Sequence, residues 1–287
     1  MKKLLFIAGI LTFFFFLIAI ASLIYVLVPY HDRTAHNIPA EKLIEIRSFD
    51  GLKLSAEQIF QGNQTNLWAL LIHSYRTDHT VMYRYGQFYL SHGYNVLYPD
   101  NRAHGNSEGI FIGMGYLDRL DILSWVRYIL SINPDAQIII HGLSMGAAAA
   151  LCFSGLDYAE LDHVIAIISD ASYKSAESYL SEKLKKKFHL PAFPLIPILN
   201  LASKVATGYA LSDASPMNFI GKSNIPTLII HGSLDESVSV NDAYVLYNSA
   251  RMRKELLIIP DAGHTHSLKT APETYLKTIQ NFIETSN

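Results

Sequence analysis

Cysteine and net charge are both scarce in this sequence. Cys152 is the single cysteine among 287 residues, which rules out a disulfide within the chain, so a folded domain must be held by its apolar core. The net charge of −2 lacks the basic excess of nucleic-acid-binding proteins, so no nucleic-acid partner is expected. Phosphate-loop and His-Glu-x-x-His motifs are absent, and we therefore expect no cofactor and no metal ion.

Charge is also absent from one long stretch, Leu4–Val28. Its 25 residues would span about 37 Å as a helix, enough to cross a bilayer. Lys2 and Lys3 precede the stretch and no comparable positive excess follows it, so the positive-inside rule places the N-terminus in the cytoplasm. The sequence therefore predicts a single-pass transmembrane signal anchor over residues 1–30, located in the cell membrane, and an extracytoplasmic domain over residues 31–287.

A cleaved secretory signal is the alternative for this segment, because Ala19-Ile20-Ala21 resembles a small-residue cleavage site. The apolar run continues to Val28, however, well past the roughly 7 to 15 apolar residues of a signal peptide. Both interpretations export the domain, and they differ in whether it stays attached to the membrane.

The exported part alternates strand and helix patterns along most of its length. Two strands around Asp50-Gly51, over 43–47 and 52–59, have the pattern of an antiparallel hairpin. Continuous apolar runs such as Val164–Ile168 are typical of a parallel sheet covered on both faces. Further strands are expected over 68–73, 95–98, 137–141, 163–168, 227–231 and 255–259, with helices over about 80–92, 116–132, 240–251 and 272–284 and from 145. The fold class predicted is α/β, with a mostly parallel central sheet and helices on both faces.

The strand pattern is interrupted over about residues 171–214. A connection of that length between two core strands is too long for a plain loop, and it predicts an inserted helical cap that forms a lid or a binding wall. Lys185, Lys186 and Lys187 precede Phe188 within it. A solvated helix face is the favoured interpretation of these lysines, and contact with anionic lipid is the alternative.

Gly142-Leu143-Ser144-Met145-Gly146 stands between an apolar run, Ile138–Ile140, and a run of alanines. Strand, sharp turn and helix is the context in which a serine hydroxyl projects from a sheet edge as a nucleophile. We therefore predict that Ser144 is the nucleophile, with a plain helix N-cap as the alternative role.

A serine nucleophile needs a histidine to take its proton and a carboxylate to orient that histidine. Two later strands run directly into Asp235 and His264, so both residues should stand at the same sheet edge as Ser144. Asp170, at the end of the strand before the cap, is the alternative acid. His266 is the alternative base, but Gly263 gives the tight turn that favours His264.

Residues 40–285 resemble the α/β-hydrolase superfamily, and within it exported or membrane-anchored bacterial serine hydrolases of the serine-aminopeptidase-like or esterase-like kind. The resemblance rests on five motifs: His73-Ser74-Tyr75, Asp100-Asn101-Arg102-Ala103-His104-Gly105, the turn at Ser144, His231-Gly232-Ser233-Leu234-Asp235 and Ala262-Gly263-His264. It implies an oxyanion hole formed by the backbone N–H groups of Tyr75 and Met145. Ser74 and Ala103 stand where glycine is common in such families.

The resemblance implies hydrolysis of an acyl bond through an acyl-enzyme. Because the cap has no acidic cluster to hold a peptide's free amine, we expect a small-molecule ester or other short acyl substrate. A peptidase or amidase, an acyltransferase on the same residues, and a non-catalytic surface binding protein remain alternatives. The sequence leaves the oligomeric state open.

Overall fold

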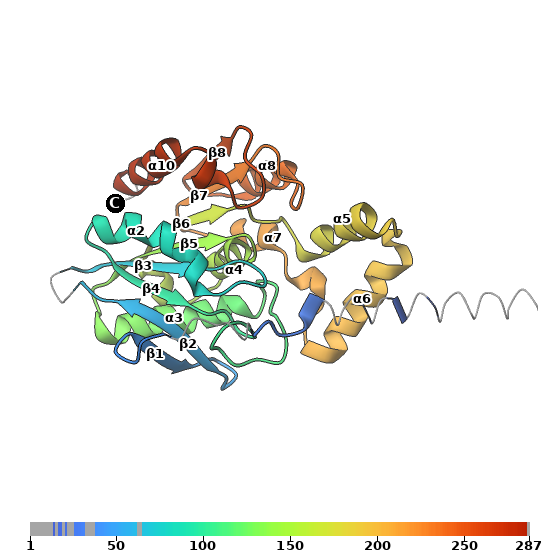
Figure 1. Ribbon diagram of the computed structural model, residues 1–287, viewed down its shortest axis with the longest axis horizontal. Coiled ribbons are helices and arrows are strands. Elements are labelled where there is room, and N and C mark those ends of the chain that lie inside the picture. The colour runs from blue at the N-terminus through green and yellow to red at the C-terminus, as the bar shows by residue number, and fades with distance from the viewer. Residues whose placement is uncertain are drawn as a thin grey trace, which may run out of the picture.

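The computed structural model describes residues 26–31, 38–61 and 65–285, together with Phe14, Leu17, Ile18 and Ala21 (Figure 1). Within these residues, no helix has the length and apolar character needed to cross a bilayer. Most of the predicted membrane helix, Leu4–Val28, lies outside the described residues, so that expectation stays a prediction.

One mixed sheet forms the centre of the described structure (Figure 1). Its strand order is β1-β2-β4-β3-β5-β6-β7-β8. Strands β1 and β2 form the predicted antiparallel hairpin, and strands β3 to β8 run parallel to one another. This arrangement confirms the predicted mostly parallel α/β sheet. The strands are β1 (Leu43–Arg47), β2 (Lys53–Ile59), β3 (Leu67–Ile72), β4 (Asn95–Pro99), β5 (Gln137–Leu143), β6 (Val164–Asp170), β7 (Thr227–Gly232) and β8 (Lys254–Ile259).

Helices connect the strands and cover both faces of the sheet. Outside the cap they are η1 (His79–Met82), α2 (Tyr83–Ser91), α3 (Asp118–Ile132), α4 (Met145–Ser154), η2 (Ala159–His163), α7 (Pro216–Ile220), α8 (Val240–Ser249), α9 (Ser267–Thr270) and α10 (Pro272–Glu284). Side chains alternate between the faces along each strand, so Ile138 and Ile140 point to one core and Ile139 to the other.

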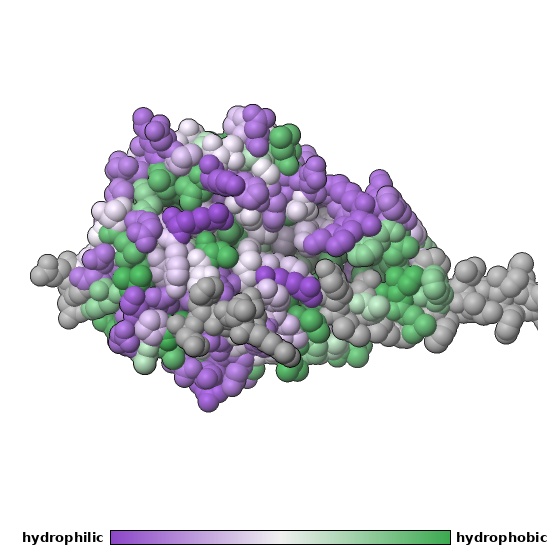
Figure 2. Space-filling view, in the orientation of Figure 1, coloured by the Kyte–Doolittle hydropathy of each residue, from purple (hydrophilic) through white to green (hydrophobic). Residues whose placement is uncertain are grey.

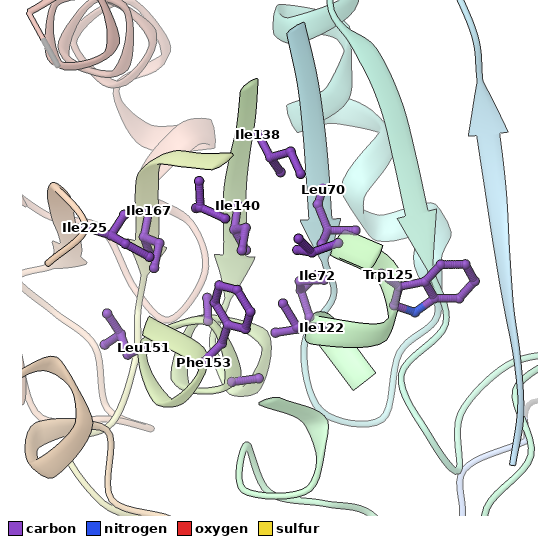
Figure 3. Close-up of a cluster of buried hydrophobic side chains, with 14 of the residues drawn as sticks. Leu70, Ile72, Ile122, Trp125, Ile138, Ile140, Leu151, Phe153, Ile167 and Ile225 are labelled. Atoms are coloured by element: carbon purple, nitrogen blue, oxygen red, sulfur yellow. The ribbon is translucent and has the colours of Figure 1, made fainter. Parts of the chain in front are cut away.

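The larger core lies between the sheet and helices α3, α4, α7 and α8, where Trp125, Leu151 and Phe153 meet the strand residues (Figure 3). The second core lies against α2 and α10 on the opposite face. Cys152 is buried within α4, as expected of a packing residue. Burial on both faces explains why the central strands are apolar throughout.

The cap, residues 171–214, is helical and contains no strand. It consists of α5 (Ala176–Phe188), α6 (Ala192–Thr207) and the short turn η3 (Leu211–Asp213), which lie beside the sheet rather than on either face (Figure 1). Ser175 caps α5 by accepting a hydrogen bond from the backbone N–H of Ser178. Lys185, Lys186 and Lys187 are exposed, in keeping with a solvated face, while the lipid-contact alternative stays untested.

The N-terminal segment, residues 26–31, runs along the domain rather than away from it. Leu27 is only 2% exposed and its carbonyl accepts a hydrogen bond of 2.9 Å from the N–H of Ile112. The N–H of Tyr30 donates to the carbonyl of Ala103 over 2.7 Å. The last residues of the predicted membrane span therefore contact protein, because the loop after β4 offers backbone partners and apolar side chains to them.

Candidate active site

Ser144 occupies the turn between β5 and α4. Its backbone angles, φ 54° and ψ −111°, lie in a region that residues with side chains rarely adopt, as the sequence predicted for a nucleophile at such a turn. The N–H of Ser144 donates to the carbonyl of Asp170, at the end of the neighbouring strand β6, over 2.8 Å. The serine is therefore held by its own backbone at the edge where the parallel strands end.

The two glycines around Ser144 allow this turn to form. A methyl group at Gly142 would lie 2.4 Å from the carbonyl oxygen of Gly146, and one at Gly146 would lie 2.3 Å from the carbonyl oxygen of Ile72. Both distances are far below van der Waals contact with backbone atoms that cannot move aside. Glycine is thus required here for the close approach of α4 to β5 and β3.

Ser144, His264 and Asp235 form one hydrogen-bonded chain. The Oγ of Ser144 lies 2.9 Å from Nε2 of His264, and Nδ1 of the same ring lies 2.6 Å from Oδ2 of Asp235. An ionised carboxylate only accepts hydrogen bonds, so Nδ1 carries the proton and Nε2 is left to accept one from the serine hydroxyl. The structure thus brings together the three side chains singled out in the sequence.

The Asp235 carboxylate is fixed by four contacts. Its Oδ1 accepts hydrogen bonds from the N–H groups of Ser237 and Val238, at 2.8 Å and 2.9 Å. Its Oδ2 lies against His264 and, at 3.2 Å, against Nε2 of His231. Burial would raise the pKa of Asp235, but the hydrogen bonds from His231 and His264 outweigh burial and hold the pKa well below its ordinary value. The carboxylate is therefore charged and fixed in orientation across the neutral range.

Asp170, the alternative acid, has other partners. Its carboxylate accepts hydrogen bonds from the hydroxyls of Tyr275, at 2.9 Å, and Ser267, at 3.2 Å. Burial raises the pKa of Asp170 to about 6. The hydrogen-bond geometry around His264 therefore favours Asp235 over Asp170 as the orienting acid.

Tyr75 and Met145, the two expected oxyanion donors, occupy matching positions. Ile72 of β3 pairs with Gly142 of β5. Tyr75 stands three residues after Ile72, and Met145 stands three residues after Gly142. Tyr75 and Met145 therefore lie beyond the ends of two adjacent parallel strands, at the sheet edge that carries Ser144.

Two buried histidines hold the loop that carries Tyr75. His73 accepts a hydrogen bond of 2.9 Å at Nε2 from the N–H of Asn101, and His104 accepts one of 3.1 Å at Nε2 from the N–H of Arg76. Burial lowers the pKa of His104 to about 3, so its ring is neutral and able to accept. Both histidines therefore make buried loop contacts.

The two departures from the usual glycines have different structural outcomes. Ser74 does not adopt a positive φ, and its hydroxyl lies 3.1 Å from that of Thr77, so a glycine is not required there. Ala103 has φ 60°, which explains why glycine is common at this place. The loop tolerates alanine because Ala103 is bonded through its N–H to Glu108 and through its carbonyl to Tyr30.

Side chains from distant positions also hold this loop, and no motif in the sequence predicts them. His79 donates from Nδ1 to Asp100 over 2.8 Å, and this contact outweighs burial and lowers the pKa of Asp100 to about 2. Arg102 binds Asp121 in bidentate fashion as well as Asp50. Asp100 and Arg102 thus organise the loop, and nothing in the sequence identifies which residues they contact. In the described part of the chain, no three histidine, cysteine or acidic side chains are grouped as metal ligands.

The chain matches no family model but is similar to bacterial proteins of unknown activity. YqkD of Bacillus subtilis, an uncharacterized protein, is 32% identical over 205 residues, which make up 71% of this chain and 67% of YqkD. YfhR of Salmonella typhi, also uncharacterized, is 28% identical over 203 residues, or 67% of this chain. The chain spans only 62% of the length of YfhR.

A solved structure shares the fold over nearly its whole length. The Pyrococcus furiosus esterase Pf2001 superimposes with a TM-score of 0.71 and 24% identity, covering 88% of this chain and 98% of Pf2001. At this identity the likeness establishes the arrangement of strands and helices, and nothing about the substrate.

The buried Asp170 should make stability depend on pH. Its pKa is about 6 in the folded chain against an ordinary value of 3.8, so the folded state loses stability as the pH rises from about 4 through 6. Asp170→Asn removes this titration. In urea unfolding experiments, we expect the free energy of unfolding of the wild type to fall by on the order of 3 kcal/mol relative to that of the variant between pH 4 and pH 8. A difference between the two proteins that stays constant with pH would contradict the assignment.

Proposed function

This chain belongs to the same family as YqkD of Bacillus subtilis and has the fold of an α/β-hydrolase, and we propose that it is a serine hydrolase that cleaves an acyl bond through an acyl-enzyme. The observation that carries the proposal is the hydrogen-bonded chain from Ser144 through His264 to Asp235. Its geometry matches what a serine needs in order to become a nucleophile near neutral pH.

The proposed reaction begins when Ser144 Oγ attacks the acyl carbonyl and His264 Nε2 takes the hydroxyl proton. Asp235 stabilises the resulting imidazolium through its hydrogen bond to Nδ1. The N–H groups of Tyr75 and Met145 would stabilise the negative oxygen of the tetrahedral intermediate. His264 then donates the proton to the leaving group, and water attacks the acyl-enzyme with His264 again acting as base to release the acid.

We favour an ester over a peptide with a free amine as the substrate. The cavity beside Tyr75 is lined by two lysines, Lys183 and Lys187, and by no acidic side chain among the described residues. Positive charge there disfavours the ammonium group of an aminopeptidase substrate. The esterase activity named for the structurally similar Pyrococcus furiosus protein is in keeping with this choice. An acyltransferase would use the same residues with an alcohol in place of water.

Substitutions at the three residues test the proposal. Ser144→Ala should abolish hydrolysis of p-nitrophenyl butyrate and covalent labelling by a fluorophosphonate probe. Asp235→Asn should lower kcat by roughly 10⁴-fold, because the histidine loses its orienting carboxylate. Asp170→Asn, which alters the other buried acid at this sheet edge, is the control and should change kcat less than about threefold.

Several results would overturn this assignment. Labelling of Ser144→Ala at another serine would mean that Ser144 is not the nucleophile. Equal losses of kcat in the two aspartate variants would mean that Asp235 is not the specific orienting acid. A folded wild-type protein that neither reacts with the probe nor hydrolyses any ester would favour the non-catalytic binding protein.

We also propose that the apolar N-terminus anchors the domain at the outer face of the cell membrane. The support is the uncharged run Leu4–Val28 behind Lys2 and Lys3, together with the contact of residues 26–31 with the domain. That contact leaves little free chain between the proposed anchor and the site. Substrate would therefore be met close to the lipid surface.

Expression of the full chain in a bacterial host tests the anchor. We expect the protein to remain in the membrane pellet after an alkaline carbonate wash, and protease added to spheroplasts to remove the domain. A shortened protein in the medium would establish a cleaved signal instead. Protection of the domain from external protease would reverse the proposed orientation.

A further inference from the structure

We propose that an apolar cavity between the cap and the N-terminal residues binds the long acyl chain of a lipid ester; this inference rests on the proposed function and specifies its substrate class. The cavity measures about 410 Å³, a size typical of small-molecule sites. Its walls include Leu180, Leu184 and Leu199 from the cap, Met114 from the loop before α3, and Ile18 and Val26 from the N-terminus.

The cavity lies beside one of the two proposed oxyanion donors, because Tyr75 forms part of its wall. Met145, the residue directly after Ser144, does not line the cavity but belongs to the same buried apolar cluster as Met114, Leu184 and Leu199. The apolar cluster around the cavity therefore reaches the residue next to Ser144. Under this proposal, an acyl chain whose carbonyl carbon lies at Ser144 extends past Tyr75 into the cavity.

The cavity is composite, because its walls come from segments far apart in the sequence. The Tyr75 hydroxyl donates a hydrogen bond of 3.0 Å to the carbonyl of Val26, which joins the oxyanion loop to the N-terminal segment. Ile18 and Ala21 complete the wall beyond Val26. The apolar N-terminus therefore has a second role, as one side of the binding site.

The two lysines in the wall are compatible with an apolar occupant. The Lys183 ammonium group is hydrogen-bonded to the Tyr179 hydroxyl and lies 4.6 Å from the centre of that ring. The Lys187 ammonium group lies 5.7 Å from the centre of the Phe188 ring. Their methylene stems can therefore line the cavity while their charges are engaged by aromatic groups.

The outer surface of the cap indicates where the ester comes from. Phe193, Leu201 and Val205 on α6 are 79%, 66% and 82% exposed. Figure 2 shows apolar surface over part of the cap. Helix α6, which contributes Leu199 to the cavity wall, thus also presents apolar side chains outward. A lipid surface would cover these side chains and supply long-chain esters.

This inference differs from the short acyl substrate expected from the sequence. Burial of each additional methylene in the cavity should raise kcat/KM by up to about fourfold until the cavity is filled. The full chain in nanodiscs of non-hydrolysable ether lipid should therefore prefer p-nitrophenyl laurate to p-nitrophenyl butyrate.

Leu184→Trp tests the cavity by filling it. We expect kcat/KM for the laurate ester to fall at least tenfold, while that for the butyrate ester changes less than about twofold. Ile132→Trp, at a half-exposed position at the end of α3 and outside the cap, is the matched control and should leave both values unchanged. Leu199→Phe is a second cavity variant in case Leu184→Trp does not fold, and fluorophosphonate labelling of Ser144 reports folding. An equal loss for both esters, or none for laurate in a labelled variant, would overturn the inference.

A binding assay separates this inference from the proposed function. Ser144→Ala of the full chain is irradiated with a photoreactive long-chain fatty acid, and crosslinks are mapped to α5 and α6 by mass spectrometry. We expect the additional change Leu184→Trp to reduce these crosslinks about tenfold relative to the control change Ile132→Trp. If no ester is hydrolysed but crosslinking follows this pattern, binding of the acyl chain in the cavity is supported and the proposed function is wrong. Hydrolysis without chain-length preference or cavity crosslinks would leave the proposed function and remove the inference.

Discussion

Ser144 has a strained backbone conformation at the turn between β5 and α4, and packing throughout the domain holds it there. Its backbone conformation costs about 1–3 kcal/mol for a residue with a side chain, and it persists only because its surroundings fix it. Gly142 and Gly146 permit backbone contacts that a methyl group would prevent. The sheet supplies the N–H contact to Asp170, and α4 begins at once in an alanine-rich run buried in the core. The position of the hydroxyl is therefore set by packing that extends through the whole domain.

Around this turn, each polar side chain of the site is oriented by a second buried group. Asp235 is held by two backbone N–H groups and by His231 before it meets His264. The Tyr75 loop is held by neutral His73 and His104. Little reorganisation would be needed as charge develops, which is the condition under which fixed dipoles stabilise a transition state most. The proposed activity and the rigidity of the loops thus have the same structural origin.

Local patterns were enough to predict the central sheet and the residues at its edge. Apolar strands buried on both faces are recognisable in a sequence, and Ser144 and Asp235 each follow such a strand within a few residues. His264 follows the partly buried edge strand β8 in the same way. Long-range contacts leave no such pattern in the local sequence. Nothing local indicates that Tyr75 binds the carbonyl of Val26, or that His79 reaches Asp100. The apolar N-terminus is interpreted from the sequence as a membrane span, with a cleaved secretory signal as the alternative, because hydropathy cannot distinguish lipid from a protein wall.

A strained serine and an apolar cavity shared by the cap and the N-terminus would both act on one species, the acyl-enzyme. That species can be detected by mass spectrometry of the protein quenched in acid during turnover of a long-chain ester. We expect one added acyl group, on the peptide that contains Ser144. Turnover with no acyl adduct, or with the acyl group on another residue, would show that Ser144 is not the nucleophile.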